Sequence, residues 1–144
     1  MVTFPLKFEV KATATDGVSH PWSAQADKLP PIPSAIPPEF MGPGTGYSPE
    51  DLFAIAVLNC LIALFKVYCE KGRVSFHEIQ GRAITTIDRQ PSEMSFSIVQ
   101  IEIFLNVTGS SDLVKIRKLL DTAIKDCPVG QSIKSGKTFH ISVT

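Results

Sequence analysis

The sequence predicts an α+β domain, because strand-like and helix-like hydrophobic patterns occupy separate blocks of the chain. Apolar and polar residues alternate through residues 6–12 and 99–107, as in half-buried strands. Helical spacing of apolar residues covers about 49–71 and 113–127. The predicted order is two strands, a long helix, two or three strands, a second helix and a closing strand.

Length and composition indicate one domain over residues 1–144, long enough to bury a core. Lys plus Arg is 14 and Asp plus Glu is 14, so a neutral chain gives no reason to expect a nucleic-acid partner. Only 19% of the residues are charged, whereas 44% are hydrophobic. A surface with so few charges favours an oligomer that covers apolar area.

The cellular compartment is expected to be the cytoplasm. The N-terminal residues show no secretory signal pattern. The longest apolar run, 52–65, is shorter than the roughly 18–20 residues that a membrane span needs, which favours a buried core helix and no membrane. Three cysteines are an odd and low number for a secreted disulfide scaffold.

The first third of the chain is predicted to open with a β-hairpin. Trp22, Ala24 and Ala26 alternate with polar residues after the turn residues Asp16 and Gly17. Residues 29–46 hold six of the eleven prolines. Such a segment is expected to be an ordered, extended connection that contains neither a helix nor a central strand.

The long helix has clear start and stop signals. Ser48 can cap free backbone N–H groups, Pro49 suits the first helical position, and Glu50 and Asp51 place negative charge at the positive end of the dipole. Gly72 suits the residue after the last turn. Because the first half is apolar nearly all round, we expect this helix to be covered on most sides.

The second half of the chain is predicted to form a sheet and an amphipathic helix. A change of apolar parity indicates a bulge near 78–81, and residues 90–92 indicate a turn. A cap at residues 109–112 precedes the second helix, which Pro128 ends. A short closing strand is expected over 137–143.

Two cysteines are candidates for chemistry, although free cysteine is often simply a small buried hydrophobe. Cys60 lies in the middle of the long helix, where a reactive thiol would need an external cation. Cys127 precedes Pro128 and is predicted to cap a short turn, where the dipole and free N–H groups would lower its pKa. Cys69 lies roughly 13 Å along the helix from Cys60 and receives no role.

No metal and no other cofactor are expected. The three histidines lack metal-ligand spacing, and the chain contains no CxxC, HExxH, phosphate-binding loop or GxSxG motif. Glu50 is the remaining candidate, and favourable interaction with the helix dipole is sufficient to explain its position.

An ordered set of short motifs resembles the OsmC/Ohr family of thiol peroxidases over essentially the whole chain. The set consists of Gly42-Pro43-Gly44-Thr45, Ser48-Pro49-Glu50-Asp51-Leu52-Phe53, Cys60 and the pair Cys127-Pro128. The resemblance implies an OsmC-like fold with an N-terminal β-hairpin, a long central helix, an antiparallel sheet, a second amphipathic helix and a closing strand. It also implies an intertwined homodimer with active sites at the subunit interface.

The same resemblance implies site residues and partners. Cys60 would be the peroxidatic thiol, Cys127 the resolving cysteine, and Glu50 would orient a catalytic arginine. The substrate would be an organic hydroperoxide and the reductant an external dithiol, as part of an antioxidant response to oxidative stress. Glu50 and Cys60 are roughly 15 Å apart on a straight helix, so they share a site only through a bend, a long arginine or a second subunit.

This chain departs from the family at the arginine. The family carries it in the turn after the first strand, whereas this chain has no arginine before Arg73. The basic candidates to replace it are His20, Lys28, Arg73, Arg82 and Arg89. The alternative function is a non-catalytic OsmC-like protein that binds a hydrophobic, acyl or thiol-bearing small molecule at the dimer interface.

Overall fold

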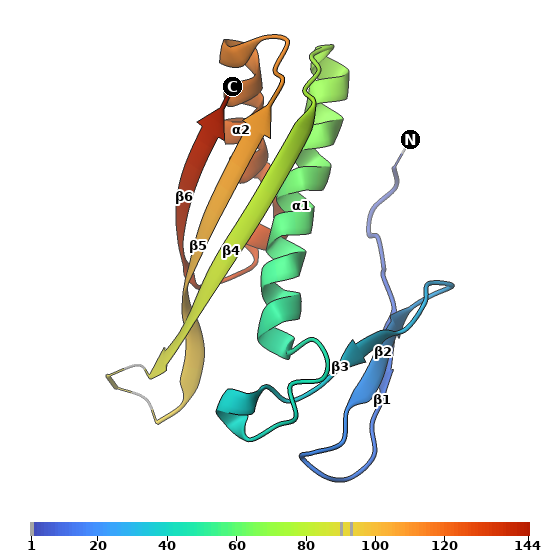
Figure 1. Ribbon diagram of the computed structural model, residues 1–144. Coiled ribbons are helices and arrows are strands. Elements are labelled where there is room, and N and C mark those ends of the chain that lie inside the picture. Colours follow the sequence, from blue (N-terminus) through green and yellow to red (C-terminus); the bar gives the residue numbers. More distant parts are fainter. Residues whose placement is uncertain (1, 90, 93) are drawn as a thin grey trace. The chain divides into compact units, whose positions relative to one another are not determined.

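The computed structural model describes residues 2–89, 91–92 and 94–144 (Figure 1). The chain divides into two compact units, Met1–Leu52 and Phe53–Thr144. Residue 90 of the predicted 90–92 turn lies outside the described residues.

The first unit contains a small antiparallel sheet in the order β1-β2-β3. β1 (Val10–Thr13) and β2 (Trp22–Ala26) form the predicted hairpin, although β1 begins four residues later than the alternation suggested. β3 (Ile32–Ser34) is a third strand inside the proline-rich segment. Pro33 is tolerated because β3 lies at the edge of this sheet, where a missing N–H donor need not face a neighbour.

The rest of the proline-rich segment is tightly folded. It contains a short 3-10 helix, η1 (Pro38–Phe40), so the expectation that it contains no helix was wrong. Proline at the start of one short turn loses no hydrogen bond, because the first N–H groups of a helix have no internal partner. A side chain at Gly42 would collide with the backbone of Ile36, which explains a glycine there.

The helix α1 (Pro49–Gly72) has the predicted bounds within one residue. The Ser48 hydroxyl accepts a hydrogen bond from the Asp51 N–H at 3.0 Å, and the Asp51 carboxylate accepts one from the Ser48 N–H at 3.0 Å. These reciprocal bonds form a capping box that fixes the start of the helix.

The second unit is built on a three-stranded sheet in the order β4-β5-β6. Its strands are β4 (Glu78–Arg89), β5 (Phe96–Thr108) and β6 (Gly136–Val143). β4 pairs with β5 in antiparallel register, but β5 and β6 are parallel, so the expected antiparallel sheet is a mixed one. A helical crossover between β5 and β6 returns the chain to the same end of the sheet, which makes parallel pairing possible.

The predicted bulge is also displaced. The register shifts between Thr86 and Ile87, not at residues 78–81. The change of parity that suggested a bulge near 78–81 arises because residues 73–77 precede the strand.

The crossover consists of α2 (Leu113–Asp126) and α3 (Pro128–Gln131). The carboxylate of Asp112 caps α2 by accepting a hydrogen bond from the Lys115 N–H at 3.0 Å. The core of the second unit joins one stripe of α1, the inward face of β5 and one face of α2. Its buried members are Val57, Leu61, Phe65, Cys69, Ile101, Ile103, Leu105, Val107, Ile116, Leu120, Ala123 and Cys127.

The helix α1 is less covered than the sequence suggested. Its buried residues recur every four positions from Val57 to Cys69, whereas Ile55 and Val67 are exposed. By length and composition α1 could cross a membrane, and 22% of its most apolar window is buried. Helix length therefore does not exclude a span, but the buried stripe packed on a sheet is typical of a core helix.

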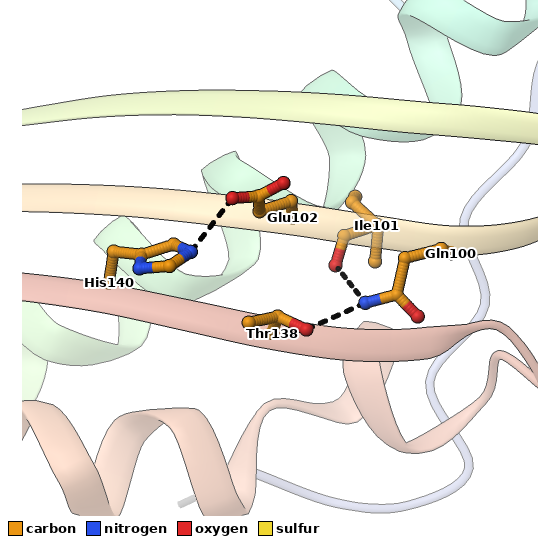
Figure 2. A network of polar contacts seen from close by, with 5 residues as sticks. All are labelled: Gln100, Ile101, Glu102, Thr138 and His140. Atoms are coloured by element: carbon orange, nitrogen blue, oxygen red, sulfur yellow. Dashed lines mark hydrogen bonds and ion pairs between the residues drawn. The ribbon is translucent and has the colours of Figure 1, made fainter.

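The outward face of the β4-β5-β6 sheet carries a row of polar side chains (Figure 2). The Gln100 amide donates a hydrogen bond to the Thr138 hydroxyl at 2.7 Å, and His140 lies 2.8 Å from Glu102. Phe104 stacks on His140 with ring centroids 4.6 Å apart. These cross-strand pairs join β5 to β6 on the side opposite the helices.

Candidate functional site

Cys60 is placed by the regular rise of α1. It lies directly before the buried Leu61 and is itself half-buried. The four residues on either side of it, 56–64, contain no other titratable side chain. Its own helix therefore surrounds this sulfur with apolar groups and one amide, from Asn59.

Cys127 lies at the joint between α2 and α3, as predicted. Pro128 cannot continue α2 but suits the first position of α3, so the chain changes direction at Cys127. The Gly130 N–H donates a hydrogen bond to the Cys127 sulfur at 3.4 Å, which makes this thiol the N-cap of α3. The side chain is buried.

The two thiols come together although 67 positions separate them in the sequence. The Cys60 side chain is hydrogen-bonded to Cys127. Cys69 is the third free thiol; it is buried, and burial raises its pKa. The structure thus brings the two predicted cysteines, both free thiols, into contact.

The predicted net lowering of the Cys127 pKa was wrong, although the cap itself acts in the predicted direction. Burial, followed by the hydrogen bond to Cys60, raises the pKa of Cys127 to about 11. The N–H groups of Gly130 and Val129 act in the lowering direction, but they are outweighed. Cys127 therefore keeps its proton at neutral pH and can donate it in a hydrogen bond to the Cys60 sulfur.

A cavity of about 180 Å³ opens beside Cys127. It is lined by Val57, Leu61, Ile124, Cys127, Gly130, Gln131, Ile133, Lys137 and Phe139. Most of these side chains are apolar, so the cavity suits a small, largely apolar molecule. Of the lining residues, Lys137 alone carries a charge.

Lys137 is the residue that sequence reasoning missed. It occupies the same face of β6 as Phe139, Ile141 and Val143, which pack on the core. A lysine in the first place of an otherwise apolar, inward-facing row is a local exception to the strand pattern. That exception is the signal in the sequence that points to Lys137.

Glu50 lies in the first turn of α1, where it complements the helix dipole. One of its carboxylate oxygens, Oε2, is buried and has no hydrogen-bond partner among the described residues. At 1.5 Å per residue, Glu50 and Cys60 are about 15 Å apart along the helix. The structure therefore does not bring Glu50 to the thiol pair through α1 itself.

Two of the candidate replacement arginines interact with aromatic rings. The Arg82 guanidinium lies 4.1 Å from the centroid of Phe104, and that of Arg89 lies 4.9 Å from the centroid of Phe96. Neither arginine lines the cavity beside Cys127. Among the described residues, no group of three or more His, Cys, Asp and Glu side chains could hold a metal ion.

Comparison with known proteins assigns the chain to a family. The model of the family described as OsmC-like protein matches residues 42–142. An OsmC-like protein of unknown function from Vibrio cholerae has a similar structure, with a TM-score of 0.82, 16% identity, and coverage of 95% of this chain and 99% of that one.

Two organic hydroperoxide resistance proteins are also similar in structure. OhrB of Bacillus subtilis matches with a TM-score of 0.67 and 18% identity over 96% of this chain and 98% of that one. A putative organic hydroperoxide resistance protein from Vibrio cholerae, with captopril bound in one of its active sites, matches with a TM-score of 0.70 and 22% identity. That match covers 99% of this chain and 95% of that one.

None of the curated protein sequences compared with the chain is a significant match. The family match nevertheless spans more than half of the chain, and the α+β architecture with its long helix and two small sheets agrees with it. The resemblance inferred from the motifs is thus confirmed, and the chain belongs to the OsmC-like protein family.

Proposed function

We propose that this protein is a thiol-dependent peroxidase that reduces organic hydroperoxides in the cytoplasm as part of an antioxidant response. The observation that carries the proposal is the contact between Cys60 and Cys127 beside a small apolar cavity. An apolar wall favours hydroperoxides with a hydrocarbon part over hydrogen peroxide.

The proposed reaction begins with Cys60. Its thiolate attacks the outer oxygen of the hydroperoxide, the O–O bond breaks, and the alkoxide leaves as the alcohol after taking a proton. Cys60 is thereby oxidised to a sulfenic acid. The protonated Cys127 then condenses with it, which forms the Cys60–Cys127 disulfide and releases water. An external dithiol reduces this disulfide and restores both thiols.

A second copy of the chain completes the proposed site. α1 leaves apolar residues such as Ile55 and Val67 exposed, and the first unit exposes Phe4, Phe8 and Val10. A second copy would cover this area in an intertwined homodimer. Glu50, whose Oε2 has no partner among the described residues, would then act at the interface by orienting a basic group.

The test is peroxidase turnover with cumene hydroperoxide and a dithiol reductant. The wild-type protein should turn over, and Cys60→Ser should abolish the reaction. Cys127→Ser should leave a single oxidation per chain, because the sulfenic acid has no resolving partner. Cys69→Ser is the matched control and should retain turnover. Full turnover by Cys60→Ser would refute the proposal.

The second candidate is a non-catalytic protein that binds a hydrophobic, acyl or thiol-bearing small molecule. The apolar cavity and the departure at the family arginine favour it, and captopril occupies an active site of one related structure. Native mass spectrometry of the purified protein would detect a retained ligand. A ligand-free protein with normal hydroperoxide turnover would eliminate this candidate.

A further inference from the structure

A cysteine thiolate is stabilised by a positive charge placed close to the sulfur. The family arginine is missing from the first turn, and α1 supplies no basic side chain within four residues of Cys60. The cation must therefore come from another element of this chain or from the second copy.

We propose that Lys137 supplies the positive charge that stabilises the Cys60 thiolate, in place of the family arginine. The inference rests on the proposed function and deepens it, since it assigns a positioning residue to the same site. Its basis is the cavity: Lys137 and Cys127 line the same space, and Cys127 is in contact with Cys60.

The backbone around Lys137 is fixed. Lys137 is paired with the fully buried Ile101 of β5. Two residues earlier, the hydroxyl of the buried Ser135 donates a hydrogen bond to the Ile98 carbonyl at 2.6 Å. The loop that leads into β6 is thus held to the sheet, so the lysine enters the cavity wall from a rigid position.

The ammonium group itself is only weakly bound. Lys137 Nζ lies 3.5 Å from the Ile133 carbonyl oxygen and 3.4 Å from the Ser135 carbonyl oxygen, both long for hydrogen bonds. No carboxylate of the described part of the chain lies within ion-pair distance of it. An ammonium with three N–H groups and no counter-ion can therefore respond to negative charge on a thiol.

Few other charged groups face the pair. Within four residues of Cys60, α1 has no other titratable side chain; the joint contributes Cys127, and α3 and the inward face of β5 contribute none. Asp126, next to Cys127, is exposed and accepts a hydrogen bond from the Tyr68 hydroxyl at 2.7 Å. Lys125, Lys134 and Lys137 are all exposed, but of the three only Lys137 lines the cavity. Lys137 thus has no charged competitor among the residues of the cavity wall.

The test is the pH dependence of Cys60 alkylation by iodoacetamide, resolved from the other cysteines by peptide mass spectrometry. Lys137→Met should move the midpoint of the Cys60 profile upward by about one pH unit or more, and should slow alkylation at pH 7 about tenfold. Lys137→Arg keeps the charge and should restore most of the rate. Lys134→Met, a matched loss of charge outside the cavity, should leave the profile unchanged.

An unchanged profile in Lys137→Met, or an equal shift in Lys137→Arg, would overturn the inference. Circular dichroism and the unfolding midpoint identify any variant that has lost its fold, and Lys137→Gln then provides a second neutral substitution. Alkylation uses no peroxide, so its outcome is independent of the turnover assay. If Lys137→Met shifts the Cys60 profile but the wild type shows no turnover, the role of Lys137 stands and the peroxidase proposal is refuted. If the wild type turns over but Lys137→Met leaves the profile unchanged, the peroxidase proposal stands and the role of Lys137 is refuted.

Discussion

Cys127 experiences two opposing influences. N–H groups at the start of α3 favour its thiolate, whereas burial and the contact with Cys60 favour its thiol. Burial has the larger effect, so the pKa rises to about 11 from an ordinary value of 9.0. A protonated Cys127 fits a resolving role, in which it waits until Cys60 has been oxidised.

This shift predicts a loss of stability in alkali. The folded state binds the Cys127 proton more tightly than the unfolded state, so the stabilisation is complete below about pH 9 and is lost as pH rises toward about 11. Under reducing conditions, urea denaturation measures the unfolding free energies of wild type and Cys127→Ser. The difference between the two values should change between about pH 9 and about pH 11. Cys69 and Tyr68, whose pKa values are also raised, titrate in both proteins. A difference that does not vary with pH would contradict this explanation.

The N-terminus of α2 is fixed by a single side chain. The Asp112 carboxylate satisfies the Lys115 N–H, which would otherwise lack a partner in the first turn. Asp121, on the same helix, forms only a half-exposed pair with Arg117 at 3.4 Å. The two aspartates therefore differ in what their removal should do.

Asp112→Ala should destabilise the protein by about 1 kcal/mol, because it removes the N-cap. Asp121→Ala should change stability by at most about 0.5 kcal/mol, because exposed ion pairs contribute little. Urea denaturation of both variants measures the difference. Equal effects would show that the cap is not the basis of the start of α2.

The elements also show what sequence patterns can predict. Ser48, Pro49, Asp112 and Pro128 fix helix ends through local backbone chemistry, so both long helices were predicted closely. The parallel pairing of β6 and the strand β3 were missed, because pairing direction depends on the path of the chain in space. The Cys127 pKa was mispredicted for a related reason, since burial is a tertiary property. Lys137 was overlooked because a cavity wall joins residues from several elements.

The exposed apolar surface of the protein requires an explanation. Ile55 is 37% exposed on α1 although its helix is among the most hydrophobic parts of the chain. An exposed apolar helix face in a protein without net charge favours self-association. The proposed homodimer is the arrangement that would cover it.

Light scattering after size-exclusion chromatography should give twice the chain mass. Ile55→Lys should shift the protein toward the monomer, because an ammonium would be buried in the interface. The matched control is Val114→Lys, at an 82% exposed position on α2, which should remain dimeric. A monomeric wild type, or identical behaviour of the two variants, would contradict the proposed interface.

Disulfide mapping tests whether Cys60 and Cys127 form a redox pair. The reduced protein is treated with one equivalent of cumene hydroperoxide, its remaining thiols are blocked, and its peptides are identified by mass spectrometry. The predicted result is a Cys60–Cys127 disulfide with Cys69 still a free thiol. Recovery of Cys60 as an unmodified thiol, or of a disulfide that includes Cys69, would contradict the proposed redox pair.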